Sequence, residues 1–302
     1  MNKNFLRIVE KEKPDYIFLW LIYEEFCPET LIKIRQVSPK TKIINFFGDD
    51  DTQFETFTRY FSLLIDYLLC FPQKRKKDYQ KEKIKNVFFT RMVNTNVFKP
   101  LNVNKKYDIT FVGTPKSDRA ELLYYLKKKG IKIRIFGAGW ERYPEFKEAY
   151  LGRLNNEDFI KVINQSKINL CLSKNYLNKL HVKGRIFNVS ACKSFALLEY
   201  FKDYYKFFSK DEIVMFKDKE DLLNKIRYYL KNEEEREKIA ERAYKKVIKK
   251  YNLEVELGNF FNKVYSERDI PPKTNLPNMD GRVLSLGIEN LNSRYIAEKL
   301  KD

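Results

Sequence analysis

Hydrophobic residues occur in short runs that alternate with longer amphipathic segments through most of this chain. In the first third, apolar runs predict strands at residues 16–20, 42–47, 67–71 and 87–89. The segments between them predict helices, among them residues 5–13, a helix that begins at Pro28 or Glu29, and residues 73–83. Strands that alternate with helices are typical of a parallel sheet with helices on both faces. The pattern therefore predicts an α/β fold.

The same alternation resumes after a polar segment at residues 94–106, which contains Pro100. Strands are predicted at residues 107–112, 131–136, 168–172 and 195–198. A polar, proline-containing stretch between two such blocks is typical of a linker. We expect two α/β lobes with a cleft between them, hinged near residues 94–106: a first lobe at residues 1–100 and a second at 107–251. Residues 252–268 should form a return helix, and residues 269–302 a linker followed by an appended helix or a tail.

The composition indicates a folded cytoplasmic protein. Apolar residues make up 43% of the 302 residues, which is ample for hydrophobic cores. The longest clean apolar run, residues 16–23, is too short to span a bilayer, and the first residues do not read as a signal peptide. The four cysteines lack metal-ligand spacing and have apolar neighbours, so we expect buried thiols in a reducing compartment.

The formal net charge of +18 indicates an anionic partner, such as a nucleotide-sugar diphosphate, an anionic membrane or a nucleic acid. A biased composition with solvated lysine faces explains the charge equally well. No zinc-finger spacing or RNA-recognition motif accompanies the basic runs, so we expect no nucleic acid as partner.

Glycines follow two of the predicted strands in the second block. Gly113 ends the strand at residues 107–112 and is followed by Lys116 and Arg119, in a strand–glycine–loop–helix order that lets backbone amides approach a phosphate. An ordinary tight turn is the alternative. Gly137 and Gly139 follow the next strand, and ligands of open α/β sheets bind at the carboxyl ends of strands. We expect both of these glycines to line the cleft.

Residues 183–199 read KGRIFNVSACKSFALLE and predict a helix that leads directly into a buried strand. Lys183 and Arg185 lie near the start of this helix, where free backbone N–H groups and the helix dipole favour an anion. The alternative is a plain core helix with exposed basic side chains.

The block from residue 183 to residue 251 resembles the C-terminal part of the CgeB-like glycosyltransferases, relatives of the group 1, family 4 enzymes. The matching motifs, in order, are Arg185-Ile186-Phe187-Asn188, Ala191-Cys192-Lys193, Leu198-Glu199, residues 211–216 and Tyr228-Tyr229-Leu230. Three positions depart from the family pattern, which has Glu at Asn188, Gly at Lys193 and Thr at Leu198. The resemblance covers residues 12–262 and implies a GT-B fold of two Rossmann-like lobes, with the N-terminal lobe shortened at its start.

The resemblance also implies roles for individual residues. Arg185 and Lys183 would neutralise the leaving diphosphate, and Asn188 would take the place of a carboxylate that holds the ribose. Gly113, Lys116, Arg119, Gly137, Gly139 and Glu199 would complete the donor site. Asp50, between Asp49 and Asp51, resembles a family acidic pair that would face the acceptor hydroxyl or position the sugar; a helix cap is the alternative.

The expected activity is the transfer of a sugar from a nucleotide-sugar, as co-substrate, to an acceptor hydroxyl on an unknown glycan, lipid or protein. By resemblance it would retain anomeric configuration and need no metal and no other cofactor, in the cytoplasm or at the inner face of an anionic membrane. One alternative is a glycosyltransferase-like binding protein without turnover, which Asn188, Lys193 and the shortened lobe favour. Another alternative is a nucleic-acid or membrane-surface binding module, and only the net charge supports it.

Overall fold

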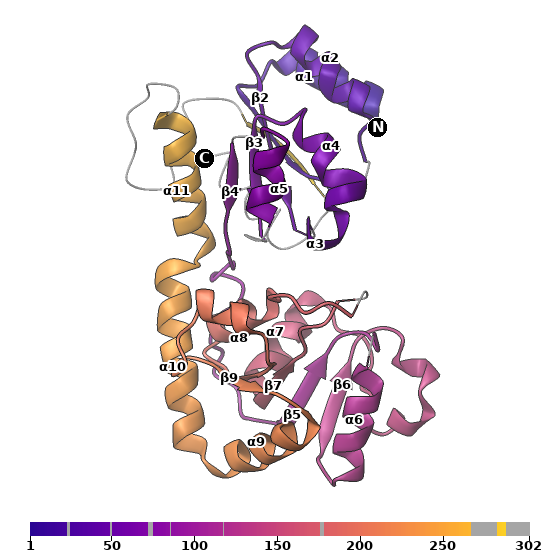
Figure 1. Cartoon of the computed structure of the whole chain (residues 1–302), viewed down its shortest axis with the longest axis vertical. Helices are drawn as coiled ribbons and strands as arrows, with labels where there is room; N and C mark the ends of the chain where they lie inside the picture. Colours follow the sequence, from indigo (N-terminus) through magenta and orange to yellow (C-terminus); the bar gives the residue numbers. More distant parts are fainter. Residues whose placement is uncertain are drawn as a thin grey trace. The chain divides into compact units, whose positions relative to one another are not determined.

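The computed structural model describes residues 1–22, 25–48, 50–71, 75–84, 86–116, 118–175, 178–266 and 283–287, with side chains left out at 51, 52 and 283–287. The chain divides into two compact units (Figure 1). Unit 1 comprises Met1–Met92 with Glu254–Asp302, and unit 2 comprises Val93–Leu253.

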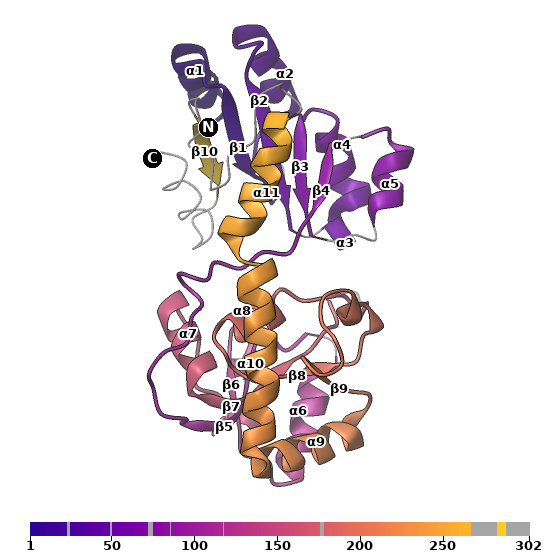
Figure 2. The same ribbon diagram turned by 90° about the vertical axis from the view of Figure 1, so that its left-hand side faces the viewer.

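Unit 1 contains a five-stranded parallel sheet in the order β10-β1-β2-β3-β4 (Figure 2). Its strands are β1 Tyr16–Trp20, β2 Lys42–Phe47, β3 Tyr67–Cys70, β4 Val87–Phe89 and β10 Val283–Gly287. Four of these match the predicted strands closely, because each is an apolar run bounded by polar or proline residues. The register joins Ile17 to Ile43 and Ile44 to Tyr67 across neighbouring strands.

Helices cover both faces of the sheet in unit 1. They are α1 Asn2–Glu12, α2 Pro28–Val37, α3 Asp50–Gln53, a π-helical turn at Phe54–Thr58, α4 Arg59–Ser62, α5 Lys76–Lys81 and α11 Leu253–Ser266. Helix α11 packs on the sheet through Phe260, whose ring lies 6.5 Å from that of Tyr67 and 5.0 Å from that of Phe88. The other helices enclose a core that includes Ile17, Leu31 and Phe57.

Two expectations for unit 1 are wrong. Residues 282–302 were expected to form a helix or a tail, but Val283–Gly287 form β10, which pairs in parallel with β1. The alternation in VLSLG suits a strand, and the free edge of β1 supplies its partner. Cys27 is exposed, because it occupies the N-cap position of α2, whereas the other three free cysteines are buried as expected.

Unit 2 contains a second five-stranded parallel sheet, in the order β6-β5-β7-β8-β9. Its strands are β5 Tyr107–Val112, β6 Ile133–Phe136, β7 Ser166–Cys171, β8 Ala196–Glu199 and β9 Val214–Phe216. From β5 the chain first moves to β6 on one side and then returns to β7 on the other. The strand order therefore reverses between β5 and β7, and in open α/β sheets such a point is where ligands bind.

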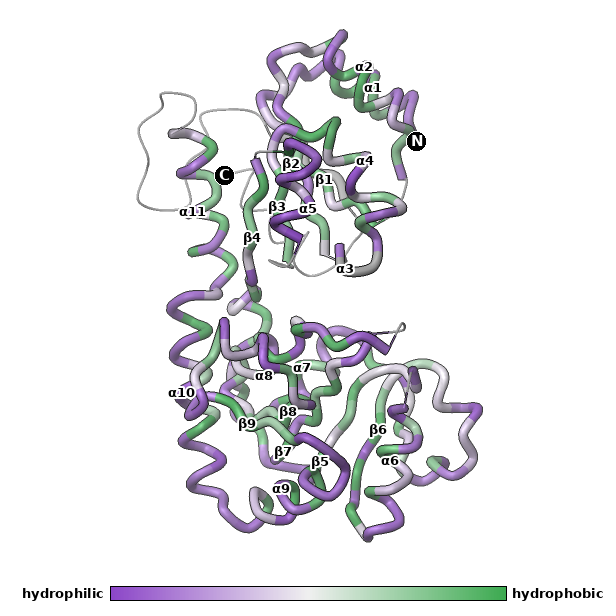
Figure 3. Tube along the Cα trace, in the orientation of Figure 1, coloured by the Kyte–Doolittle hydropathy of each residue, from purple (hydrophilic) through white to green (hydrophobic). Residues whose placement is uncertain are grey.

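The helices of unit 2 enclose two cores, one on each face of this sheet. They are α6 Arg119–Lys128, α7 Asn156–Gln165, α8 Arg185–Ala191, α9 Lys219–Lys231 and α10 Glu233–Lys250, with 3-10 turns at Trp140–Arg142, Pro144–Phe146 and Lys202–Lys206. Along β8, Leu197 enters the core under α6 and α9, whereas Leu198 enters the core with α8. Hydrophobic colours accordingly follow the strands in Figure 3, and much of α10 is hydrophilic.

Side-chain caps begin two of these helices. Asn155 begins α7 by accepting a hydrogen bond from the backbone N–H of Asp158 at 2.8 Å. Asp218 caps α9 by accepting from Glu220 and Asp221. No helix in the described part of the chain is long and apolar enough to cross a membrane.

Candidate functional site

The candidate site lies where the strand order of unit 2 reverses. Gly113 follows β5, Ser173 follows β7 and Glu199 ends β8, so these residues share the carboxyl edge of the sheet. Helices α6 and α8 begin at the same edge, with Arg119 and Arg185 as their first residues. The fold therefore brings together segments that are up to 86 residues apart in the sequence (113 to 199).

Three glycines allow two loops to touch at this edge. A Cβ atom on Gly137, whose φ is +126°, would lie 2.4 Å from the carbonyl oxygen of Gly113. One on Gly139, at φ +91°, would lie 3.2 Å from Pro115. The indole N–H of Trp140 donates to the same Gly113 oxygen at 2.6 Å. The glycines thus hold the loop after β5 close against the loop after β6, which only a residue without a side chain permits at position 137.

Two arginines approach the Gly113 turn from different helices. Arg185 donates from Nη1 to the carbonyl of Val112 at 2.5 Å, and its guanidinium lies over the ring of Phe159 at 4.9 Å. Arg119 donates from Nη1 to Thr114 at 3.0 Å and from Nη2 to Lys174 at 2.9 Å. Both guanidinium groups therefore bond to backbone carbonyls beside the turn.

The electrostatics of this pair favour an anion. Burial lowers the pKa of Arg185, and the nearby charge of Arg119 lowers it further. Burial also lowers the pKa of Arg119, which Glu199 and Asp118 partly oppose. Lowered pKa values mean that each cation lacks part of the stabilisation that water gives it. An anion bound at the turn would restore that stabilisation.

Glu199 is bound to the loop that follows β7. Its Oε2 accepts from the backbone N–H of Ser173 at 2.7 Å, and its Oε1 lies 3.6 Å from the ammonium of Lys174. Lys174 also pairs with Asp118, and this pair raises the pKa of Lys174. Because the side chain of Glu199 is only 16% exposed, it holds this loop in place and offers little surface to a ligand.

Three other candidates lie around the same edge. Lys116 is exposed in the loop after Gly113. The backbone N–H of Lys183 donates to the hydroxyl of Tyr204 at 3.3 Å, and that hydroxyl is also 2.9 Å from the Ser173 hydroxyl. Asn188 is partly buried on α8, three residues after Arg185 and so on the same side of the helix.

Asp50 belongs to unit 1 and not to this edge. It begins α3, is fully buried, and accepts a hydrogen bond from the hydroxyl of Tyr79 at 2.6 Å. Burial raises its pKa to about 6, against hydrogen bonds from Tyr79, Cys70 and Thr58 that lower it. In this conformation the carboxylate is out of reach of solvent. Asp49 lies outside the described residues.

Sequence reasoning missed Ser173, Lys174, Tyr204 and Trp140, which support the edge through the contacts above. Ser173 and Lys174 could have been found, because they directly follow the apolar run that predicts β7. Tyr204 and Trp140 carry no such signal. Among the described residues, no group of three or more His, Cys, Asp or Glu side chains gathers as a metal site would require.

Comparisons with known proteins agree with this architecture. A family model described as "Glycosyl transferase-like" matches residues 119–261. The spore protein CgeB of Bacillus subtilis (strain 168) is 23% identical over 211 residues, which cover 63% of this chain and 65% of that protein.

Among solved structures, HepE of Anabaena in complex with UDP-glucose superposes with a TM-score of 0.64 at 9% identity, covering 88% of this chain and 82% of HepE. A glycosyltransferase of Rickettsia africae ESF-5 gives a TM-score of 0.62 at 16% identity, covering 88% and 80%. The family match includes Arg119, Arg185, Asn188 and Glu199. On these grounds residues 119–261 match the glycosyl transferase-like family, and the chain resembles CgeB and has a GT-B fold.

Proposed function

We propose that this protein is a glycosyltransferase that moves a sugar from a nucleotide-sugar donor to an acceptor hydroxyl. The observation that carries the proposal is the pair of guanidinium groups, Arg119 and Arg185, at the Gly113 turn. They lie where the strand order reverses, within the segment that matches the family. Two cations beside a glycine turn suit the diphosphate that joins the sugar to the nucleoside.

The basic residues of the site have different roles in binding the diphosphate. Among the residues that the structure describes, the guanidinium of Arg185 gives one hydrogen bond, so other N–H groups remain for a phosphate oxygen. Both Nη atoms of Arg119 are engaged by carbonyls, so Arg119 contributes its charge and positions the loop. Lys183 and Lys116 add further positive charge. Charge that develops on the leaving diphosphate is then stabilised by groups already in place.

The donor would bind in unit 2, with its ribose toward Asn188, while Glu199 holds the loop after β7 beside it. HepE has been solved with UDP-glucose and TarM with UDP, which makes uridine nucleotides the first donors to test. We propose that the reaction retains anomeric configuration and uses these basic residues in place of a metal ion. Asp50 would act on the acceptor side only if the Tyr79 side chain moved away from the Asp50 carboxylate. The acceptor is a glycan, lipid or protein hydroxyl, reached in the cytoplasm or at an anionic membrane surface.

A thermal-shift panel tests donor binding. Nucleoside diphosphates and nucleotide-sugars are expected to raise the melting temperature, because a ligand that binds only the folded state stabilises it. Uridine without phosphate is the control and should give no shift, since the cations of the site then have no anion to bind. A panel in which no nucleoside diphosphate shifts the melting temperature at millimolar concentration would contradict the proposal.

A second candidate is a binding protein without turnover, and Asn188 is the observation that favours it. A neutral amide accepts weaker hydrogen bonds from ribose hydroxyls than a carboxylate does. Asn188→Glu is therefore expected to tighten nucleotide-sugar binding by on the order of 1 kcal/mol and to raise donor turnover. Calorimetry and a donor-hydrolysis assay measure the two effects.

Asn188→Gln is the matched control, because it lengthens the side chain and adds no charge. Weaker binding by the Asn188→Glu protein would show that the site is built around the amide, and the ribose role of this position would then be wrong. Binding without hydrolysis or transfer in both forms would favour the non-catalytic candidate.

A further inference from the structure

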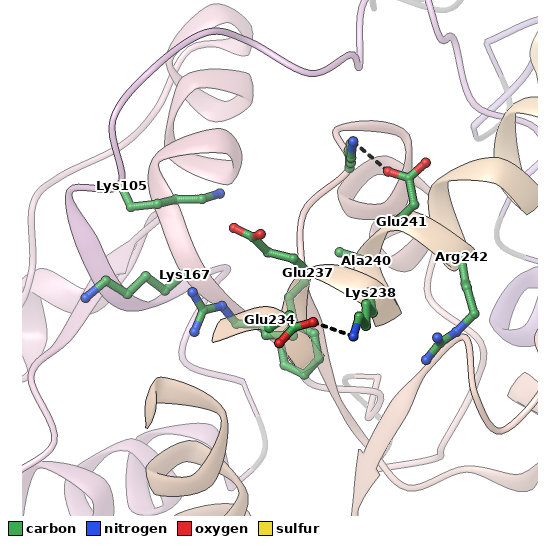
Figure 4. Close-up of a pocket in the computed structure, with 11 residues that line it drawn as sticks. Lys105, Lys167, Glu234, Glu237, Lys238, Ala240, Glu241 and Arg242 are labelled. Atoms are coloured by element: carbon green, nitrogen blue, oxygen red, sulfur yellow. Dashed lines mark hydrogen bonds and ion pairs between the residues drawn. The ribbon is translucent and has the colours of Figure 1, made fainter. Parts of the chain in front are cut away.

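A pocket lies at the opposite edge of the unit 2 sheet from the candidate site (Figure 4). Its volume is about 570 Å³, within the range of roughly 300–1,000 Å³ that is usual for small-molecule sites. Lys105 precedes β5, Lys167 lies at the start of β7, and Lys193 and Phe195 precede β8. The first half of α10 closes the other side. Since the strands are parallel, their starts mark the amino edge of the sheet, so an occupant would not compete with a donor.

Basic side chains outnumber acidic ones in the lining. The basic residues are Lys105, Lys167, Lys193, Arg236, Lys238 and Arg242, and the acidic ones are Glu234, Glu237 and Glu241. Five of the six basic residues have a carboxylate within ion-pair distance, as Lys193 has Glu241 at 2.6 Å and Lys167 has Asp108 at 2.7 Å. The lining is therefore mostly paired, with one exception.

Lys105 is that exception. Its ammonium donates to the carbonyl of Asn164 at 2.8 Å and has no carboxylate within ion-pair distance among the residues that the structure describes. Burial lowers the pKa of Lys105, the nearby Arg236 lowers it further, and Glu237 opposes both. A phosphate at this ammonium would supply a counter-charge within ion-pair distance, which no carboxylate of the described residues does.

Glu237 adds a second requirement. In Figure 4 its carboxylate and the ammonium of Lys105 point toward one another across the pocket. A carboxylate repels a bare anion and accepts hydrogen bonds from hydroxyl groups. Phe195 and Ala240 supply the apolar part of the lining. A suitable occupant therefore has an anionic end for Lys105 and a hydroxyl-bearing end for Glu237.

We propose that this pocket binds a small phosphorylated molecule that carries hydroxyl groups, with its phosphate at Lys105 and its hydroxyls at Glu237. The turn that holds Lys193 connects α8 to β8, and these elements carry Arg185 and Glu199 of the candidate site. An occupant would thus contact the far ends of two elements that build that site. The binding itself does not depend on the proposed transferase activity.

Glucose 6-phosphate is a suitable probe, with inorganic phosphate and glucose as its two halves. Calorimetry is expected to show binding of glucose 6-phosphate, weaker binding of phosphate and none of glucose. Lys105→Met removes the charge and keeps most of the side chain, and should weaken binding by on the order of tenfold or more. Lys132→Met is the matched control, because Lys132 is an exposed lysine just before β6 that does not line the pocket.

Two further variants separate this pocket from the donor site. Arg185→Ala should leave glucose 6-phosphate binding unchanged, and Glu237→Gln should reduce the preference for glucose 6-phosphate over phosphate. The proposal is overturned if the wild-type protein does not bind the probe, if Lys105→Met binds it as tightly as wild type does, or if Arg185→Ala abolishes binding. Should Lys105→Met fail to fold, Lys105→Gln makes the same test.

Discussion

Arg185→Ala is expected to weaken the binding of nucleoside diphosphates by roughly 10- to 100-fold. A hydrogen bond to a charged group contributes about 1.5–3 kcal/mol, and 1.4 kcal/mol corresponds to tenfold in affinity. Arg185 enters the site from the first turn of α8, and most of its donors have no acceptor in the part of the chain that the structure describes. Calorimetry with UDP measures the change. Circular dichroism and the melting temperature without ligand establish that the variant is folded.

Arg119→Ala is the informative comparison for this prediction. Arg119 is 9% exposed and bonds through both Nη atoms to the carbonyls of Thr114 and Lys174. Its removal takes one donor from each carbonyl, although the backbone N–H of Lys116 still bonds to that of Thr114. The loss should lower stability more than Arg185→Ala does. Arg185→Lys keeps the charge without the planar fork and should lie between wild type and Arg185→Ala. Unchanged affinity in a folded Arg185→Ala protein would exclude Arg185 from the site.

The strands could be predicted well from sequence because each is a local signal. Residues 16–20, 42–47, 87–89 and 107–112 are apolar runs with polar or proline neighbours, and the structure gives these same bounds to β1, β2, β4 and β5. The predicted strand at 131–136 begins two residues late, at Ile133, because Gly130 adopts a positive φ after α6 and residues up to Ile131 complete the turn. Strand β10 was missed, since its partner β1 is more than 260 residues away in sequence (Tyr16 to Val283).

The site was harder to predict because residue type does not determine burial. Arg119 and Arg185 are both the first residue of a helix, yet the first is held by two carbonyls and the second by one. From sequence, Gly113 was expected to let the backbone approach a phosphate, and Gly137 was expected to line the cleft. In the structure Gly137 is needed because its Cβ would collide with the Gly113 carbonyl, whereas a Cβ on Gly113 would meet the ring of Phe111 at 2.9 Å. Such contacts form only when two loops meet in three dimensions.

The free energy of unfolding of the wild-type protein is expected to fall between about pH 4 and pH 6 because Asp50 ionises. Asp50→Asn is expected to remove this part of the pH dependence. Burial raises the pKa of Asp50 from 3.8 to about 6, so the folded state prefers the neutral acid. Its contribution to stability is complete below pH 4 and is lost as the pH rises through 6. A shift of this size corresponds to about 3 kcal/mol, at 1.36 kcal/mol for each pKa unit. The asparagine side chain is neutral at every pH and avoids this cost.

Denaturant unfolding at several pH values, followed by the fluorescence of Trp20 in unit 1, measures the effect. The difference in unfolding free energy between Asp50→Asn and wild type should grow in favour of the variant from pH 4 to pH 7. Tyr79→Phe is the matched test, because it removes the 2.6 Å hydrogen bond that stabilises the ionised carboxylate. In that variant the loss of stability should begin at the same pH and extend to a higher one. If the free energies of wild type and Asp50→Asn change in parallel across this range, Asp50 is ionised in the folded protein and the neutral buried acid is ruled out.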